Sequence, residues 1–268
     1  MPSDQPAEAA AFYVPDGDGY LATALTRGPW DPGSQHAGPP CALLGRELDR
    51  VGRLERARLS RATFEILGPV PIARLTVAAE VVRPGRSVEL VEGTMAHDGK
   101  PVMRARAWRM RTTDPMELEA ATPEPDPVPG PADGEEVDFF PTGQEVGYHT
   151  AMQTRFVHGS FTAPGPALAW MRMRVPLVEG EQPAPLHRVL AAADSGNGVS
   201  SPLDYREWMF INADVSVTLR RHPDGEWVGL DAATYPEPDG VGMSDTMLRD
   251  ARGMIGRATQ SLFVAPQP

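Results

Sequence analysis

The sequence predicts an α+β fold built from two similar units, each with an antiparallel sheet wrapped around one central helix. Three observations support this fold class. Short strands, one amphipathic helix and a run of further strands follow each other in the same order twice along the chain. A stretch rich in proline and acidic residues separates the two occurrences. The chain has 268 residues and is 41% hydrophobic, which is enough for a substantial core.

The first unit begins with AFYVPDGDGY, which predicts two short strands around a turn. A helix is expected within residues 36–52, because Pro39 and Pro40 suit a first helical turn and apolar residues then recur at helical spacing. Four strands joined by turns complete the unit, and they lie in LSRATFEILGPV, LTVAAEVV, SVELVEGTMA and PVMRARAWRM.

The second unit repeats this order. Two strands are expected in YHTAMQTRFV and ALAWMRMRV, and PAPLHRVLAAADSGNG predicts a helix that ends at Gly196 or Gly198. The strands that follow lie in WMFINADVSVTLRR, EWVGLDAATY, VGMSDTMLRD and GMIGRATQSLFV.

The segment between the units contains six prolines from Pro115 to Pro131, many acidic residues and few apolar ones. Such a composition buries too little surface to order itself and is typical of an extended linker. We therefore expect an N-terminal domain over residues 1–113, a linker over 114–140 and a C-terminal domain over 141–268.

The two units can be compared position by position, because a shift of 153 residues lays 58–111 over 211–264 without a gap. If the units share a fold, buried positions should be apolar in both, and a position that breaks this rule in one unit is a functional candidate. Three positions of the second unit qualify: Gln260 aligned with Ala107, Thr234 aligned with Val81, and Asp214 aligned with Arg61.

Asp214, Thr234 and Gln260 would together supply a base, a hydroxyl and an amide, which suit the attack of water on a carbonyl. Each also has a structural interpretation. Gln260 can be an inward amide bonded to the backbone, and Thr234 is a common strand residue. Regular strand alternation places Asp214 opposite its apolar neighbours, so a β-bulge is needed to bring it to Gln260.

The start of the first helix is a candidate substrate-binding region. The free N–H groups around Gly38 would present partial positive charge to a developing oxyanion, and His36 lies directly before them. His36 is alternatively a polar loop contact. Asp194, in AAADSGNG, is interpreted as a residue at a helix end or turn, and Cys41 as a packed thiol.

Composition excludes several classes of function. A net charge of −11 disfavours binding to nucleic acid or to anionic membranes. The sequence has no HxxxH or HExxH pairing, so a metal is not expected, and no other cofactor is expected either. No run approaches the 18 apolar residues of a membrane span, and the acidic N-terminus differs from a secretory signal. We therefore expect a cytoplasmic location.

Most of the chain, apart from the linker, resembles thioesterase-like proteins with a double hotdog fold, related to acyl-CoA thioesterase II. The most specific parts of the resemblance are QHAGPP at the first helix and DARGMIGRATQ near the C-terminus. The resemblance implies hydrolysis of acyl-CoA by a catalytic Asp, a Thr or Ser, and a Gln of the second hotdog, which correspond here to Asp214, Thr234 and Gln260. It also implies an acyl-CoA substrate, and pairing of two chains into a homodimer is expected.

Two other functions remain open from the sequence. One is a non-catalytic protein that binds acyl-CoA or another acyl ligand, in which the polar residues only complete a buried network. The other is a hotdog dehydratase or hydratase, a chemistry that usually requires a His base beside a carboxylate. No histidine of the second unit occupies a convincing position for that role.

Overall fold

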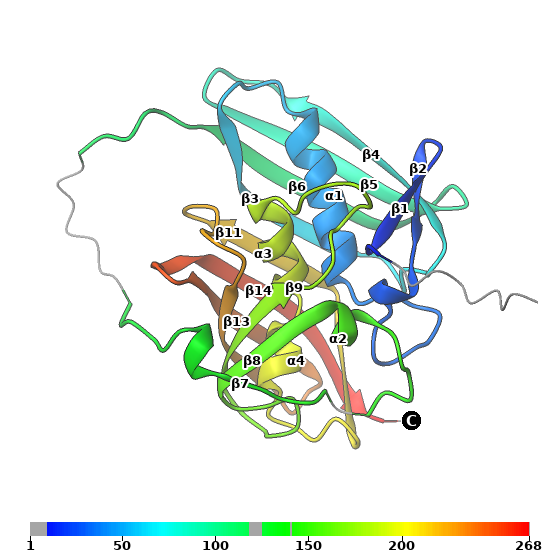
Figure 1. Ribbon diagram of the computed structural model, residues 1–268. Helices are drawn as coiled ribbons and strands as arrows, with labels where there is room; N and C mark the ends of the chain where they lie inside the picture. The colour runs from blue at the N-terminus through cyan, green and yellow to red at the C-terminus, as the bar shows by residue number, and fades with distance from the viewer. Residues whose placement is uncertain (1–9, 118–124, 140, 268) are drawn as a thin grey trace, which may run out of the picture.

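The computed structural model describes residues 10–117, 125–139 and 141–267, and within them one large antiparallel sheet packs against a few helices (Figure 1). The first-half strands are β1 (Tyr13–Asp16), β2 (Gly19–Ala22), β3 (Ala57–Ile66), β4 (Arg74–Arg83), β5 (Val88–His97) and β6 (Lys100–Arg111). The second-half strands are β7 (Glu135–Glu136), β8 (Met152–His158), β9 (Ala167–Met173), β10 (Trp208–Asn212), β11 (Asp214–Leu219), β12 (Val228–Pro236), β13 (Val241–Asp250) and β14 (Gly253–Pro266).

The α-helices are α1 (Gly38–Val51), α2 (Tyr148–Ala151), α3 (Pro185–Ala193) and α4 (Gly196–Ser200), and two 3-10 turns are η1 (Ala24–Thr26) and η2 (Pro131–Asp133). The two predicted central helices are confirmed as α1 and α3, but α3 ends at Ala193 and not at Gly196 or Gly198, because a separate short helix begins at Gly196. No helix in the described part of the chain is long and apolar enough to cross a membrane.

The sequence predicts two antiparallel sheets that can pair edge to edge, and in the structure one sheet is continuous across the two halves. Its strand order is β1-β2-β4-β5-β6-β3-β11-β14-β13-β12-β9-β8-β7, and β10 pairs with β14 beside this path. The halves join where β3 and β11 pair antiparallel, with Thr63 opposite Ser216. Each strand thereby satisfies the free backbone groups of the other, which removes two exposed sheet edges. The predicted linker 114–140 falls partly on residues 118–124 and 140, which lie outside the described residues.

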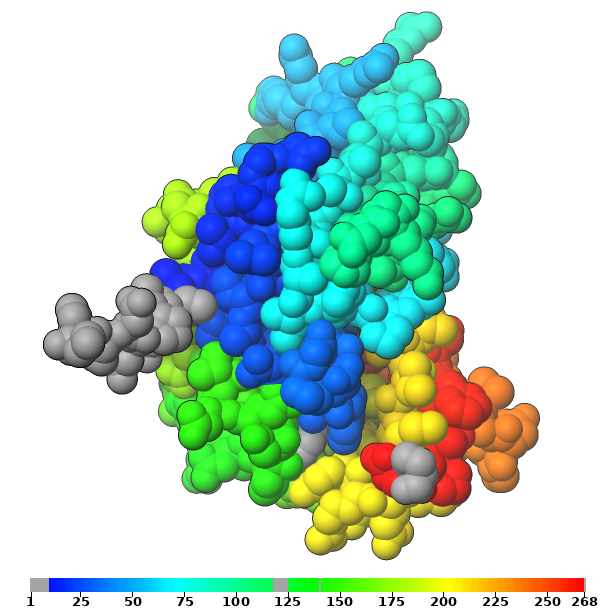
Figure 2. Space-filling model, turned by 90° about the vertical axis from the view of Figure 1, so that its right-hand side faces the viewer, coloured from blue at the N-terminus to red at the C-terminus, as the bar shows by residue number. Residues whose placement is uncertain are grey.

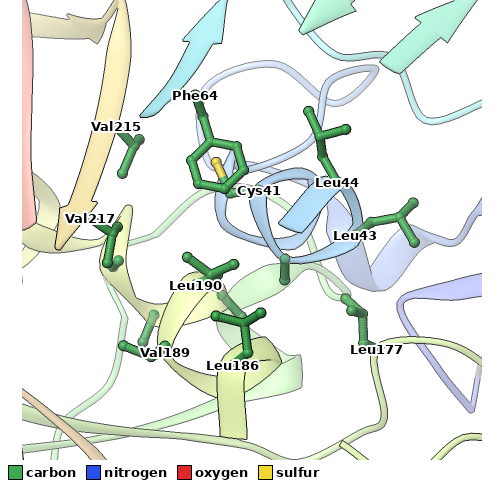
Figure 3. Packing of buried hydrophobic residues seen from close by; sticks show 14 of the residues in the cluster. Cys41, Leu43, Leu44, Phe64, Leu177, Leu186, Val189, Leu190, Val215 and Val217 are labelled. Carbon is green, nitrogen blue, oxygen red and sulfur yellow. The ribbon is translucent and has the colours of Figure 1, made fainter. Parts of the chain in front are cut away.

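The two long helices lie side by side against this sheet (Figure 1). Helix α1 starts with Gly38, Pro39 and Pro40, and proline suits a first turn because its missing N–H would be unpaired there anyway. Figure 3 shows that the core between the helices also takes residues from the two joining strands, Phe64 of β3 and Val215 of β11. One hydrophobic core therefore extends across both halves.

A β-bulge at Ala213 separates β10 from β11. On the β10 side Asn212 pairs with Leu262 of β14, whereas on the β11 side Ser216 pairs with Thr259. The chain therefore takes four residue steps from Asn212 to Ser216 while β14 takes three steps from Leu262 to Thr259. One extra residue in an antiparallel ladder moves the side chains that follow it to the opposite face of the sheet. Asn212 lies on the inward face, with buried Leu262, and Asp214 lies on the outward face.

Candidate active site

A cavity of about 590 Å³ lies where the two halves meet, within the size range of small-molecule sites. The first half contributes the loop before α1, and the second half contributes α2, α4, β10 and β14. Figure 2 shows this blue first-half chain lying against green and yellow segments of the second half. Much of the wall is aromatic or sulfur-containing, through Trp30, Met152, Phe161, Met171 and Phe210.

The most polar part of the wall is built around the carboxylate of Asp194. This residue is the C-cap of α3 and its side chain is 6% exposed. Its Oδ1 accepts hydrogen bonds from Asn212 Nδ2 at 2.6 Å and from Gln260 Nε2 at 3.1 Å. Its Oδ2 lies 3.0 Å from Nδ1 of His36. Three side-chain nitrogen atoms, from Asn212, Gln260 and His36, thus surround this one buried carboxylate.

Gln260 confirms the predicted inward orientation, because it is only 3% exposed on β14. Its amide makes hydrogen bonds at both ends: Nε2 also donates to the Asp194 backbone oxygen at 2.9 Å, and Oε1 accepts from the Asn197 N–H at 3.0 Å. Gly196 permits this arrangement, since a Cβ there would lie 2.4 Å from Thr246 Oγ1 and 3.3 Å from Gln260 Oε1. Gln260 therefore fixes the position of Asp194 at the end of α3.

His36 lies on the opposite side of Asp194 and also lines the cavity. Its ring stacks on Tyr148 of α2, with 3.7 Å between ring centroids and 6° between planes. The Tyr148 hydroxyl donates to the Ala191 carbonyl at 2.8 Å and lies 2.9 Å from Ser195 Oγ. Burial lowers the pKa of His36, although the nearby Asp194 charge opposes the shift. The ring is therefore neutral at neutral pH.

Asp214 is not part of this site, so its predicted convergence with Gln260 is wrong. Its Oδ1 accepts a hydrogen bond from the Ser261 N–H at 2.8 Å, on the outward face of the sheet, and it does not line the cavity. The physical reason is that Asp214 follows the regular alternation of β11, on the same outward face as Ser216, because the bulge at Ala213 lies before it. The bulge turns Asn212, two residues earlier, toward the site and leaves Asp214 on the other side.

Thr234 and Gly38 are near the site but do not line the cavity. Thr234 Oγ1 lies 2.9 Å from Ser200 Oγ, beneath α4, and the Ser200 hydroxyl is bonded in turn to the Gly196 carbonyl. The Gly38 N–H, expected to face substrate, instead points at Nδ1 of His36 at 3.1 Å. Of the sequence candidates, the structure therefore brings together His36 and Gln260, with Asp194 between them.

Asp194 and Asn212 are the two site residues that sequence reasoning did not select. Asp194 does end a helix, as interpreted, and the sequence carries no further signal that this helix end faces a cavity. In a regular strand Asn212 and Asp214 would lie on the same face, and only the bulge places them on opposite faces of the sheet. In the described part of the chain, no group of three or more His, Cys, Asp or Glu residues is arranged to hold a metal ion.

The continuous antiparallel sheet packed against central helices, with a polar cluster in an apolar cavity, defines a protein of the hotdog class. A hot dog fold protein from Alicyclobacillus acidocaldarius is 18% identical, with a TM-score of 0.73 and coverage of 97% of each chain. A Thermobifida fusca protein with a proposed thioesterase II assignment is 17% identical, with a TM-score of 0.74 and coverage of 96% of each chain. Acyl-CoA thioesterase II from Mycobacterium marinum is 14% identical, with a TM-score of 0.61, and the match covers 88% of this chain and 93% of that one.

Sequence families give the more specific assignment. Residues 26–110 match the acyl-CoA thioesterase N-terminal domain, and residues 119–264 match the acyl-CoA thioesterase C-terminal domain. The chain therefore belongs to the acyl-CoA thioesterase family. No curated protein matches the sequence.

Proposed function

We propose that this protein hydrolyses acyl-CoA thioesters to the free acid and CoA, with Asp194 supplying the negative charge that activates water. The observation that carries the proposal is the carboxylate of Asp194, held by Asn212, Gln260 and His36 at the wall of an apolar cavity. Family membership supports the reaction class.

The chemistry follows from a carboxylate placed beside an electrophile. Water loses a proton to the polar cluster around the Asp194 carboxylate, and the resulting hydroxide adds to the thioester carbonyl. The tetrahedral intermediate then collapses, and its C–S bond breaks. The CoA thiolate then takes up the proton. A thiolate is a good leaving group, so the reaction proceeds with the protein's own groups. Positioned acid–base catalysis of this kind contributes about 10²–10⁴-fold in rate.

The apolar wall provides a place for the acyl chain. Trp30 comes from the first half, and Phe161 and Phe210 come from the second. This shared wall supports the inference that the chain is a double hotdog, with units over residues 1–113 and 141–268 joined by residues 114–140. Pairing of two such chains into a homodimer remains a prediction, which analytical ultracentrifugation tests.

The decisive experiment measures CoA release from acyl-CoA with a thiol reagent and compares two aspartate variants. Asp194→Asn keeps the size of the side chain but removes its charge, and we expect kcat to fall by at least about 100-fold. Asp214→Asn changes a carboxylate on the other face of the same sheet, and we expect kcat to stay within about twofold because surface changes away from a site have small effects. The reverse ranking would assign the base to Asp214.

The experiment also separates hydrolysis from binding alone. A non-catalytic acyl-CoA or acyl-ligand binding protein would bind an acyl-CoA tightly, measured by calorimetry, and release no CoA. Binding without turnover in the wild-type protein would therefore contradict the proposed hydrolysis.

A second candidate function is hydration of an enoyl-CoA, and it is favoured by one observation. The sequence offered no histidine beside a carboxylate, but the fold brings His36 of the first half to 3.0 Å from Asp194 of the second. An imidazole–carboxylate pair can add water across an activated double bond as well as to a carbonyl. Loss of the enoyl absorbance without CoA release would assign this reaction instead.

A further inference from the structure

The Nδ1 atom of His36 lies near a hydrogen-bond acceptor and a hydrogen-bond donor, which require different protonation states of Nδ1. Asp194 Oδ2 is 3.0 Å away and requires a proton on Nδ1, whereas the Gly38 N–H is 3.1 Å away and requires a lone pair there. An ionised carboxylate is the stronger partner, because a charge-assisted hydrogen bond is about twice as strong as a neutral one. Nδ1 therefore carries the proton, and the neutral ring keeps its lone pair on Nε2.

The imidazole is held rigidly and its Nε2 is available. Stacking on Tyr148 fixes the ring plane, and the His36 backbone N–H donates to the Thr26 carbonyl at 2.8 Å. The side chain is 16% exposed, lines the cavity, and Nε2 has no hydrogen-bond partner among the described residues. A base must reach its proton directly or through one water, and the His36 side chain lines the cavity that would hold this water.

We infer that His36 is a catalytic residue of the proposed hydrolysis, in which its Nε2 removes the proton from the attacking water and Asp194 acts through the imidazole. This inference rests on the proposed function and assigns the base within it. Water transfers one proton to Nε2, and its oxygen forms the new bond to the thioester carbon. When the C–S bond breaks, the imidazolium returns that proton to the sulfur of CoA, so the enzyme ends unchanged.

The surroundings of the ring suit such a role. The ionisable groups in contact with the ring are Asp194 at the end of α3 and Tyr148 of α2, and Cys41 of α1 lies within electrostatic range of Asp194. Burial raises the pKa of both Tyr148 and Cys41, so both stay neutral. Because burial lowers the pKa of His36 from its usual 6.5, the free base is the main form at neutral pH, and activity should fall only in more acidic solution.

Two substitutions separate a catalytic Nε2 from a residue that only positions Asp194. In His36→Asn, the amide nitrogen can occupy the place of Nδ1 and keep the bond to Asp194, but nothing replaces Nε2. We expect kcat for CoA release to fall by at least about 100-fold and the acidic limb of the kcat/KM profile to disappear. In His36→Ala, added imidazole should restore part of the rate. His97→Gln, at the last residue of β5 and outside the site, is the control for a histidine change.

The outcomes are distinct. If the wild-type protein releases no CoA, the proposed function has failed. If it does, and His36→Asn retains its activity within about threefold or keeps the wild-type acidic limb, His36 only positions Asp194 and the inference is overturned. Binding of a non-hydrolysable thioether analogue by calorimetry shows whether each variant keeps an intact site. If His36→Asn does not fold, NMR titration of wild-type histidines decides, since the His36 pKa must match the acidic limb.

Discussion

Replacing Gly38 by alanine tests how closely α1 and α3 must approach. A Cβ added at Gly38 would lie 2.2 Å from the carbonyl oxygen of Ala191, and Cβ atoms essentially never come within 3.0 Å of another heavy atom. The two helices would have to separate by about 0.8 Å, because a carbonyl within a helix cannot rotate away. The same oxygen accepts the hydrogen bond from Tyr148, at 2.8 Å, so the separation strains that contact too.

The expected loss of stability can be worked from these contacts. Overpacking in a well-packed interior costs about 1–3 kcal/mol, and weakening the buried Tyr148 hydrogen bond adds about 1–2 kcal/mol. Alanine recovers at most about 1 kcal/mol through its helix propensity. We therefore expect Gly38→Ala to lower the free energy of unfolding by about 1–4 kcal/mol, and the melting temperature by about 2–16 °C. Ala191 precedes Asp194 by one turn, so kcat should also fall by about tenfold or more.

Gly45 on the same helix provides a matched comparison. A Cβ there would also meet α3 at 2.2 Å, but its neighbour is Leu190 Cδ1, a methyl group that can move by changing rotamer. Differential scanning fluorimetry and the CoA-release assay should show a smaller effect for Gly45→Ala than for Gly38→Ala. Equal melting temperatures for Gly38→Ala and the wild type, or a larger loss for Gly45→Ala, would refute the reasoning.

Three further predictions use the same assays. Gln260→Leu removes both amide bonds to Asp194, so kcat should fall by about 100-fold or more while stability falls by about 1–3 kcal/mol; unchanged kcat would contradict this role. Arg109→Met leaves the buried Glu89 carboxylate, 1% exposed, without its ion-pair partner, and urea denaturation should show a loss of about 3–5 kcal/mol. Burial alone would raise the pKa of Asp250, but the hydrogen bonds to its carboxylate lower the pKa by more, so that it lies below the usual 3.8. Its stabilising effect is thus present above pH 3.8 and lost as pH falls through the lower value, so Asp250→Asn should weaken the acid dependence of stability below about pH 4.

The order of elements could be predicted because it is encoded locally. Alternating apolar residues predicted the strands, and paired prolines followed by apolar residues at helical spacing predicted the start of α1. The inward position of Gln260 followed from the same alternation, since Ala258 and Leu262 lie on the buried face with it. These features depend on neighbours within a few residues, which a sequence displays directly.

The rest of the site could not be predicted, because it depends on one inserted residue and on contacts between distant segments. The bulge at Ala213 reverses strand parity, and no proline or glycine in NADVS marks it. It therefore places Asn212 on the inward face, although alternation alone would put Asn212 on the same outward face as Asp214. The approach of His36 to Asp194 depends on how α1 and α3 pack, and local periodicity carries no information about that packing.

The pairing of β3 with β11 also has a consequence for how the chain acquires its structure. Thr63 and Ser216 bond side chain to side chain across 153 residues, so β3 must wait for most of the polypeptide to be synthesised before its partner exists. Long sequence separations between paired strands slow folding, because the chain loses entropy on closing the loop before the stabilising contacts between the strands form. During translation the early half would present an incomplete ladder to other chains, and this interval is when the nascent protein is most in need of a chaperone.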